Sequence, residues 1–126
     1  MVTTAGQTYI HAINDAFMRH DVAFFEANVA DDVRWTMVGA AEPIVGKAAF
    51  LAEIETMDEG PEPALAITNV ITHGRSAAVE GTMTIDEAGV TKRYAFCDIY
   101  RLSGAGTGKI KEITAYMIDL DTGAAT

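Results

Sequence analysis

A carboxylate lies among aromatic residues in the segment from Lys92 to Leu102. Because side chains alternate along a strand, one face of this segment would carry an acid between aromatic side chains. The members of that face are Tyr94, Phe96, Asp98, Tyr100 and Leu102. Burial among apolar groups disfavours a charged carboxylate and raises its pKa. Asp98 is therefore a candidate for proton transfer, as a general base or as a protonated acid, and the alternative is a structural carboxylate satisfied by a nearby hydroxyl or amide.

The opposite face of the same segment carries the small apolar residues Ala95, Cys97 and Ile99. Cys97 has no basic or histidine neighbour in sequence that would lower its pKa, so packing is the expected role of this thiol. Glu80 has two interpretations. It pairs with Asp98 across the sheet, or it faces the outer surface or a subunit contact, which is the favoured interpretation.

The remaining polar residues do not form a recognisable cofactor site. His11, His20 and His73 have no metal-ligand spacing, so we expect no metal. The glycine-rich segment at 104–108 precedes an expected strand, whereas a phosphate-binding loop needs a helix N-terminus after it. This segment is interpreted as a turn, and no cofactor is expected.

Composition limits the classes of partner. The chain has 126 residues, 49% of them hydrophobic, which favours one globular domain over residues 1–126. The net charge of −9 disfavours nucleic acids and anionic membrane surfaces as partners. No apolar run reaches the length of a membrane span, and no signal peptide is evident. The single cysteine is typical of a cytoplasmic protein.

Helix signals concentrate in the first half of the chain. Thr4 and Gln7 fit a capping box before a helix over 5–19. Asp21 can cap a short second helix, and residues 30–32 indicate a turn into a strand over 33–38. A loop over 39–46, with an extended piece at 44–45, leads to a third helix over 47–58.

The second half has the pattern of strands, expected over 65–72, 76–85, 92–102 and 109–120. Helices gathered early and strands gathered late predict an α+β fold with an antiparallel meander and helices on one face. If the sheet curls round the helices, it encloses a pocket, and some aromatic and methionine side chains contact a ligand instead of filling the core.

Several short strings, in this order, resemble the nuclear transport factor 2-like superfamily, and in particular its SnoaL-like and ketosteroid-isomerase-like branch. The strings are Arg19-His20-Asp21, Phe24-Phe25 with residues 30–35, Pro43 to Lys47, Asp98 to Leu102, and Gly108-Lys109-Ile110 leading to Tyr116 and Asp119. The resemblance covers nearly the whole chain.

This resemblance implies a cone-shaped, strongly curved antiparallel sheet wrapped around the N-terminal helices, with an apolar pocket between them. It also implies a homodimer joined through the outer face of the sheet. The side chains then expected to bind a small apolar ligand are Phe17, Trp35, Met37, Phe50, Met83, Phe96, Ile113, Ala115 and Met117.

The family's reactive residues match this sequence only in part. Asp98 matches the strand position at which ketosteroid isomerases hold a protonated acid, but the position of their base falls near Met37 and that of their oxyanion-hole tyrosine near Ile13. Epoxide hydrolases of the limonene type need an arginine two residues before the strand acid, where this chain has Phe96. SnoaL-like cyclases rely on one pocket aspartate as acid and base, and Asp98, without a second reactive residue, is sufficient for such a reaction.

The sequence therefore predicts a small cofactor-independent enzyme, an isomerase, cyclase or hydrolase, that acts on an apolar metabolite. Asp98 would transfer a proton, with Tyr94 or Tyr100 as auxiliaries that polarise the substrate oxygen. The alternative is a non-catalytic ligand-binding or dimerisation domain.

Overall fold

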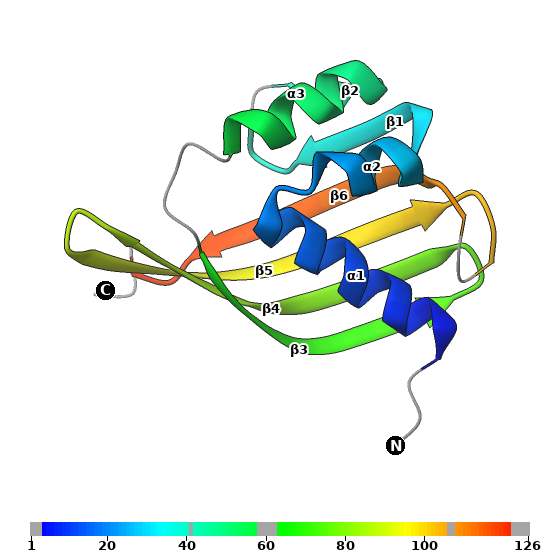
Figure 1. Ribbon diagram of the computed structural model, residues 1–126. Helices are drawn as coiled ribbons and strands as arrows, with labels where there is room; N and C mark the ends of the chain where they lie inside the picture. Colours follow the sequence, from blue (N-terminus) through cyan, green and yellow to red (C-terminus); the bar gives the residue numbers. More distant parts are fainter. Residues whose placement is uncertain (1–3, 41, 58–62, 106–107, 122–126) are drawn as a thin grey trace.

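The computed structural model describes residues 4–40, 42–57, 63–105 and 108–121. Its elements follow the chain in the order α1 (Ala5–Arg19), α2 (Val22–Asn28), β1 (Val29–Met37), β2 (Ile44–Val45), α3 (Lys47–Met57), β3 (Ala64–His73), β4 (Ser76–Glu87), β5 (Val90–Leu102) and β6 (Ile110–Asp119) (Figure 1). The predicted α+β class is confirmed, as is the position of each predicted helix and strand within a few residues.

Local capping explains where the first two helices begin. The Thr4 hydroxyl accepts a hydrogen bond from the Gln7 backbone N–H, and the Gln7 side chain accepts one from the Thr4 N–H, both at 3.1 Å. This reciprocal pair is the predicted capping box. His20 ends α1 in the left-handed conformation, and the Asp21 side chain then caps α2 by accepting from the Phe24 N–H.

The strands form a six-stranded sheet in the order β2-β1-β6-β5-β4-β3. The antiparallel meander from β3 to β6 is confirmed. β1, however, pairs with β6 in parallel, with Trp35 opposite Ile113. The turn predicted at 30–32 is wrong, because β1 already begins at Val29, which pairs with Ile110.

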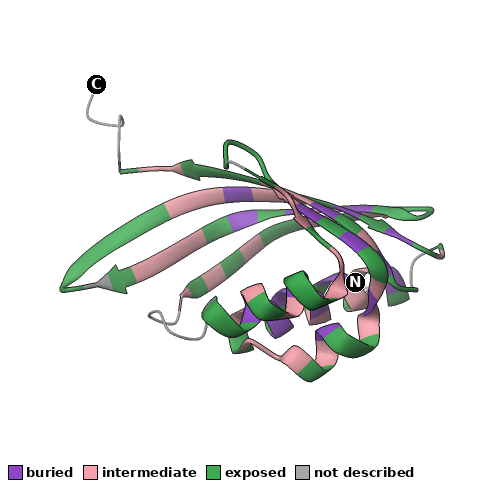
Figure 2. Ribbon diagram, turned by 90° about the horizontal axis from the view of Figure 1, so that it is seen from above, coloured by how far each residue is buried: buried purple, intermediate pink, exposed green. Residues whose placement is uncertain are grey.

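The helices cover one side of a curved sheet (Figure 2). Part of the curvature comes from the β3–β4 pair, where the register shifts between Ile67 and Asn69, so that Thr68 is an extra residue opposite Gly81 and Glu80. Such a bulge bends a strand and increases its twist. A Cβ atom at Gly81 would lie only 2.2 Å from the backbone oxygen of Ala66. The bend therefore requires glycine at this position.

The core lies between the sheet and the helices. Phe17 packs its ring against Phe25 and Trp35 at centroid distances of 4.7 and 5.3 Å, and Phe50 from α3 packs against Trp35 at 5.1 Å. Ile10 and Ile13 of α1 are completely buried. This aromatic cluster supports one end of the concave face of the sheet.

The outer face of the sheet carries exposed apolar side chains. Ile71, Ile99, Tyr116 and Ile118 are 41–65% exposed, and no helix among the described elements covers them. No described helix is long and apolar enough to cross a lipid bilayer.

Candidate functional site

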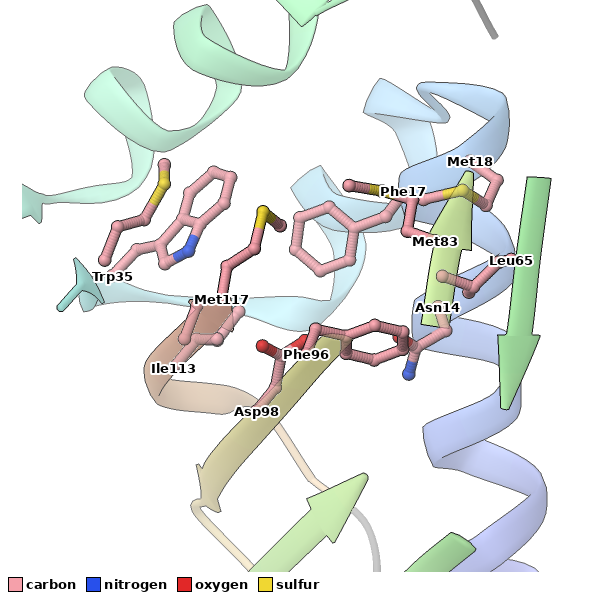
Figure 3. Close-up of a pocket in the computed structure, with 12 residues that line it drawn as sticks. Asn14, Phe17, Met18, Trp35, Leu65, Met83, Phe96, Asp98, Ile113 and Met117 are labelled. Carbon is pink, nitrogen blue, oxygen red and sulfur yellow. The ribbon is translucent and has the colours of Figure 1, made fainter. Parts of the chain in front are cut away.

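An apolar cavity of about 160 Å³ opens between α1 and the concave face of the sheet. Its walls come from α1, β1, β3, β4, β5 and β6 (Figure 3). The lining residues are Asn14, Phe17, Met18, Trp35, Met37, Leu65, Met83, Phe96, Asp98, Ile113, Ala115 and Met117. No arginine, lysine or histidine side chain is among these described lining residues, so Asp98 brings the only full charge to the cavity.

Asp98 reaches the cavity because the inward face of β5 alternates, as the sequence predicts. Its carboxylate points from the strand toward Phe17 and Met117 in Figure 3. Burial raises the pKa of Asp98 to about 6, and the hydroxyl of Tyr100, which hydrogen-bonds the carboxylate, opposes this rise only in part. The carboxyl therefore titrates close to neutral pH, where proton donors and acceptors work best.

Two buried polar side chains, Tyr100 and Asn14, form a hydrogen-bonded chain that ends at Asp98. The hydroxyl of Tyr100, a completely buried residue, donates to Oδ2 of Asp98 over 3.5 Å, a long hydrogen bond. The Asn14 side chain hydrogen-bonds Tyr100, and its Nδ2 also donates to the Ile10 carbonyl oxygen at 2.9 Å. Burial raises the pKa of Tyr100 well above its ordinary value, and the neighbouring Asp98 charge adds to this effect. Tyr100 is therefore a neutral donor that holds Asp98 in place.

Replacing Tyr100 by Phe tests this arrangement. The substitution Tyr100→Phe removes a hydrogen bond that favours the carboxylate, so the pKa of Asp98 should rise further, by about half a unit for a long bond. A carbon-13 NMR titration of the aspartate carboxyl groups measures this change. An unchanged or lower pKa would show that the 3.5 Å contact does not stabilise the charge.

Nine of the residues predicted for the site lie together in the cavity wall. They are Asp98 and the apolar residues Phe17, Trp35, Met37, Met83, Phe96, Ile113, Ala115 and Met117. Met37 and Met117 are 38% and 53% exposed, which places them where the cavity meets solvent. Methionine side chains adapt their shape easily, so this rim can adjust to a ligand.

Three predicted side chains lie outside the lining. Phe50 is completely buried behind Trp35 and contributes to the aromatic core. Tyr100 faces the same side as Asp98, but α1 covers it through Asn14, so its hydroxyl contacts Asp98 and does not line the cavity. Tyr94 is half-buried and lies nearer the N-terminal end of β5 than Asp98, opposite Met83 and Asp119. It is also absent from the lining.

Sequence reasoning missed Asn14, Met18 and Leu65. Asn14 is the most informative of these, because it is 4% exposed in the middle of a helix. It lies four residues after Ile10 and three before Phe17, on the buried stripe of α1. A carboxamide on an apolar helical stripe needs a partner in the core, and that signal was present in the sequence.

The structure decides between the two interpretations of Glu80. Glu80 is opposite Cys97 in the β4–β5 register and is exposed on the outer face, whereas Val79 is opposite Asp98. The pairing of Glu80 with Asp98 is therefore wrong. Burial raises the pKa of the Cys97 thiol, with smaller contributions from the Asp98 and Glu80 charges, which is unfavourable for a nucleophile. Among the described residues, no three histidine, cysteine or acidic side chains cluster as metal ligands would.

A strongly curved sheet that packs its concave face on helices and leaves an apolar cavity between them is the nuclear transport factor 2-like architecture. The family model described as the SnoaL-like domain matches residues 10–113. The chain therefore belongs to the SnoaL-like domain family. A search of curated proteins finds no match.

Solved structures agree with this assignment. A putative SnoaL-like polyketide cyclase from Shewanella denitrificans is similar with a TM-score of 0.81 and 14% identity, over 92% of each chain. An LEH-like epoxide hydrolase of M. tuberculosis gives a TM-score of 0.76 and 18% identity over 92% of this chain and 84% of its own. A nuclear transport factor 2-like protein of unknown function from Cytophaga hutchinsonii gives 0.71 and 28% identity over 88% and 97%. These likenesses establish the fold alone, because one of these proteins is a putative cyclase, one is an epoxide hydrolase and one has an unknown function.

Proposed function

We propose that the protein binds a small apolar molecule in the cavity and that Asp98 transfers a proton to or from it, in an isomerisation or cyclisation. The observation that carries this proposal is one carboxyl with a pKa of about 6 in a wall whose other side chains, apart from Asn14, are apolar. No other described lining residue titrates near neutral pH, so Asp98 is the group to which the reaction is assigned.

Both protonation states of Asp98 are available under ordinary conditions. With a pKa near 6, roughly a tenth of the carboxyl groups are protonated at neutral pH and the rest are ionised. The ionised form can accept a proton from a substrate carbon or hydroxyl, and the protonated form can return it to a second atom of the same substrate. The proton is thus conserved, and no oxidant or reductant is needed.

One activity of the structural neighbours and one predicted residue role are less well supported. Phe96 occupies the place where the resemblance to limonene-type epoxide hydrolases requires an arginine, which argues against this form of hydrolysis. Tyr94 and Tyr100 lie outside the cavity lining, which argues against the predicted role of a tyrosine that polarises the substrate oxygen. The alternative function is ligand binding without turnover, and it is favoured by the same lack of a tyrosine hydroxyl.

A ligand panel separates these functions. Steroids, terpenoids and aromatic polyketide-like compounds would be screened by thermal shift, and the ligands found would be incubated with protein and analysed for isomeric products. We expect Asp98→Asn to keep ligand binding and to abolish turnover. The matched control is Glu112→Gln, which removes an exposed carboxylate beside Arg101 on the outer face. Binding without any product for wild-type protein would favour the non-catalytic alternative, and no binding at all would contradict the cavity's role.

The remaining predictions concern assembly and location. The exposed apolar residues Ile71, Ile99, Tyr116 and Ile118 on the outer face support a homodimer through this face. Their burial against a second copy would explain why isoleucine occupies solvent-facing strand positions, and sedimentation analysis measures the outcome. The net charge of −9 still disfavours nucleic acid as a partner, and a cytoplasmic location stays a prediction.

A further inference from the structure

The polar groups of the cavity differ in whether their N–H and O–H hydrogens already take part in hydrogen bonds within the protein. The Tyr100 hydroxyl donates to Asp98. The amide of Asn14 donates to the Ile10 carbonyl oxygen and is also hydrogen-bonded to Tyr100. An ionised Asp98 carries no hydrogen and can only accept. These three side chains therefore offer a ligand no free donor while Asp98 is charged.

The indole N–H of Trp35 is the exception. Within the described residues no acceptor is hydrogen-bonded to this N–H, and no buried side-chain nitrogen or oxygen atom there lacks a partner. Although Trp35 is only 6% exposed, its indole nitrogen must therefore retain some contact with open space. Trp35 lines the cavity, and in Figure 3 its nitrogen lies on the ring edge that faces Met117. The open space beside the nitrogen is thus the cavity.

Packing holds this donor in a defined position. The Trp35 ring lies between Phe17, at a centroid distance of 5.3 Å, and Phe50, at 5.1 Å. In β1, Trp35 is paired with Ile113 on one side and with Ile44 on the other. A donor that is fixed before the ligand arrives loses little entropy on binding, which is how polar groups in apolar pockets provide specificity.

We propose that Trp35 donates its indole N–H to an acceptor oxygen of the ligand, so that the cavity selects an apolar molecule carrying a carbonyl or comparable oxygen. This inference rests on the proposed function in taking the cavity as the ligand site. It gives Trp35 the role that the sequence predicted for Tyr94 or Tyr100. Trp35 then orients the oxygen, while Asp98 contacts another part of the ligand.

The cavity volume limits the buried part of that ligand. A volume of about 160 Å³ is close to that of cavities of roughly 150 Å³ that accept a benzene-sized molecule. One six-membered ring therefore fits inside, and larger groups would project past the methionine rim. Cyclohexanone is a suitable probe, because it combines one ring with one acceptor oxygen, and methylenecyclohexane is its hydrocarbon counterpart of nearly equal shape.

Nuclear magnetic resonance can observe the proposed bond directly, because Trp35 is the only tryptophan of the chain and gives a single indole N–H signal. Cyclohexanone should move this proton signal downfield, as a new hydrogen bond does, and methylenecyclohexane should not. The titration belongs at about pH 8, where an Asp98 with a pKa near 6 is ionised and cannot itself donate. If the indole signal stays fixed while signals of Ala115 and the cavity methionines move with the ketone, the role of Trp35 is wrong and the cavity's role stands.

Substitutions provide the second measurement. Trp35→Phe keeps an aromatic ring and removes the N–H, so the preference for cyclohexanone over methylenecyclohexane should fall by roughly threefold to tenfold, the range for one neutral hydrogen bond. The ratio of the two affinities within one variant cancels changes in cavity shape. Met117→Leu is the control that alters the neighbouring wall, and it should keep the wild-type ratio.

The outcomes separate the inference from the proposed function. A ketone preference that survives in Trp35→Phe would overturn the inference. A preference that disappears on raising the pH from about 5 to about 8 would also overturn it, because a protonated Asp98 would then be the donor. If neither probe moves any signal of the cavity residues, the cavity does not bind one-ring ligands and the inference fails, while the proposed function is decided by the panel of larger ligands.

Discussion

Asp98→Asn should make the protein more stable at about pH 8 and leave its stability nearly unchanged at about pH 4. In the folded chain the pKa of Asp98 is raised from 3.8 to about 6, so between these values the folded state binds more protons than the unfolded state. The free energy of unfolding therefore falls as pH rises through this window, and the loss is complete above about pH 6. The asparagine of the variant would carry no charge in either state and would avoid this loss.

The expected effect is large for one substitution. A shift of about two pKa units corresponds to nearly 3 kcal/mol, and partial solvation of the carboxyl reduces this to about 2 kcal/mol. For a chain of this size, the increase in Tm would be about 5–8 °C. Thermal unfolding followed by circular dichroism over a pH series measures it. Glu112→Gln, which removes an exposed carboxylate, should change Tm by about 2 °C or less at every pH. Equal stabilities of wild type and Asp98→Asn at high pH would mean that Asp98 is ionised without cost.

A stability gain of this kind also bears on function. A carboxylate kept in an apolar wall at the expense of stability is the pattern expected of a group retained for chemistry or ligand binding. If Asp98→Asn is more stable and has lost turnover, the two results together identify the carboxyl as functional. If the variant is less stable at every pH, Asp98 is a structural acceptor for Tyr100.

Gly81→Ala should destabilise the protein by about 3 kcal/mol and weaken ligand binding. The new Cβ atom would lie 2.2 Å from the Ala66 oxygen and 3.0 Å from two further backbone atoms of β3, which cannot rotate away as a flexible side chain would. The strands β3 and β4 would have to separate at the bulge. Leu65 and Met83, which pair with each other next to this bend and line the cavity, would move with them.

Urea denaturation measures the stability change of Gly81→Ala, and titration with cyclohexanone measures the affinity. The control is Thr82→Ala, an exposed neighbour in the same strand for which a change within about 0.5 kcal/mol is expected. A Gly81→Ala variant as stable as this control would show that the bulge relaxes at little cost. Retained affinity in a destabilised variant would show that the bend supports the fold without shaping the cavity.

Local chemistry made much of the fold predictable. The capping box at Thr4 and the cap at Asp21 act over three residues, so the sequence alone indicates where both helices begin. Strand alternation placed Asp98 on the concave face for the same reason, because it depends only on neighbouring residues. The pairing of β1 with β6 was not predictable in this way, since it joins residues such as Trp35 and Ile113 from opposite halves of the chain.

Side-chain alternation along the strands predicted which face of the sheet each site residue occupies, and nothing further about the site. Alternation treats Asp98 and Tyr100 alike, but Asn14 of α1 lies against Tyr100, and only Asp98 lines the cavity. Asn14 acquires a role only when Tyr100 is placed against it. Likewise, the free N–H of Trp35 can be recognised only after the acceptors around it are known. The sequence shows that Asn14 needs a partner in the core, but which partner it has, and that the Trp35 N–H is free, depend on tertiary contacts for which one sequence holds no local signal.

The strand order has a consequence for how the chain reaches this structure. β6 comes last among the described strands, yet it lies inside the sheet between β1 and β5. During synthesis, the edge of β1 that pairs with β6 therefore stays unpaired until β6 has been made. Contacts of such long sequence separation form slowly. Ile113 and Met117 belong to β6, so the cavity wall is complete only once β6 has paired. The fluorescence of Trp35, the only tryptophan of the chain, would respond both to the pairing with β6 through Ile113 and to the packing of Phe17 and Phe50.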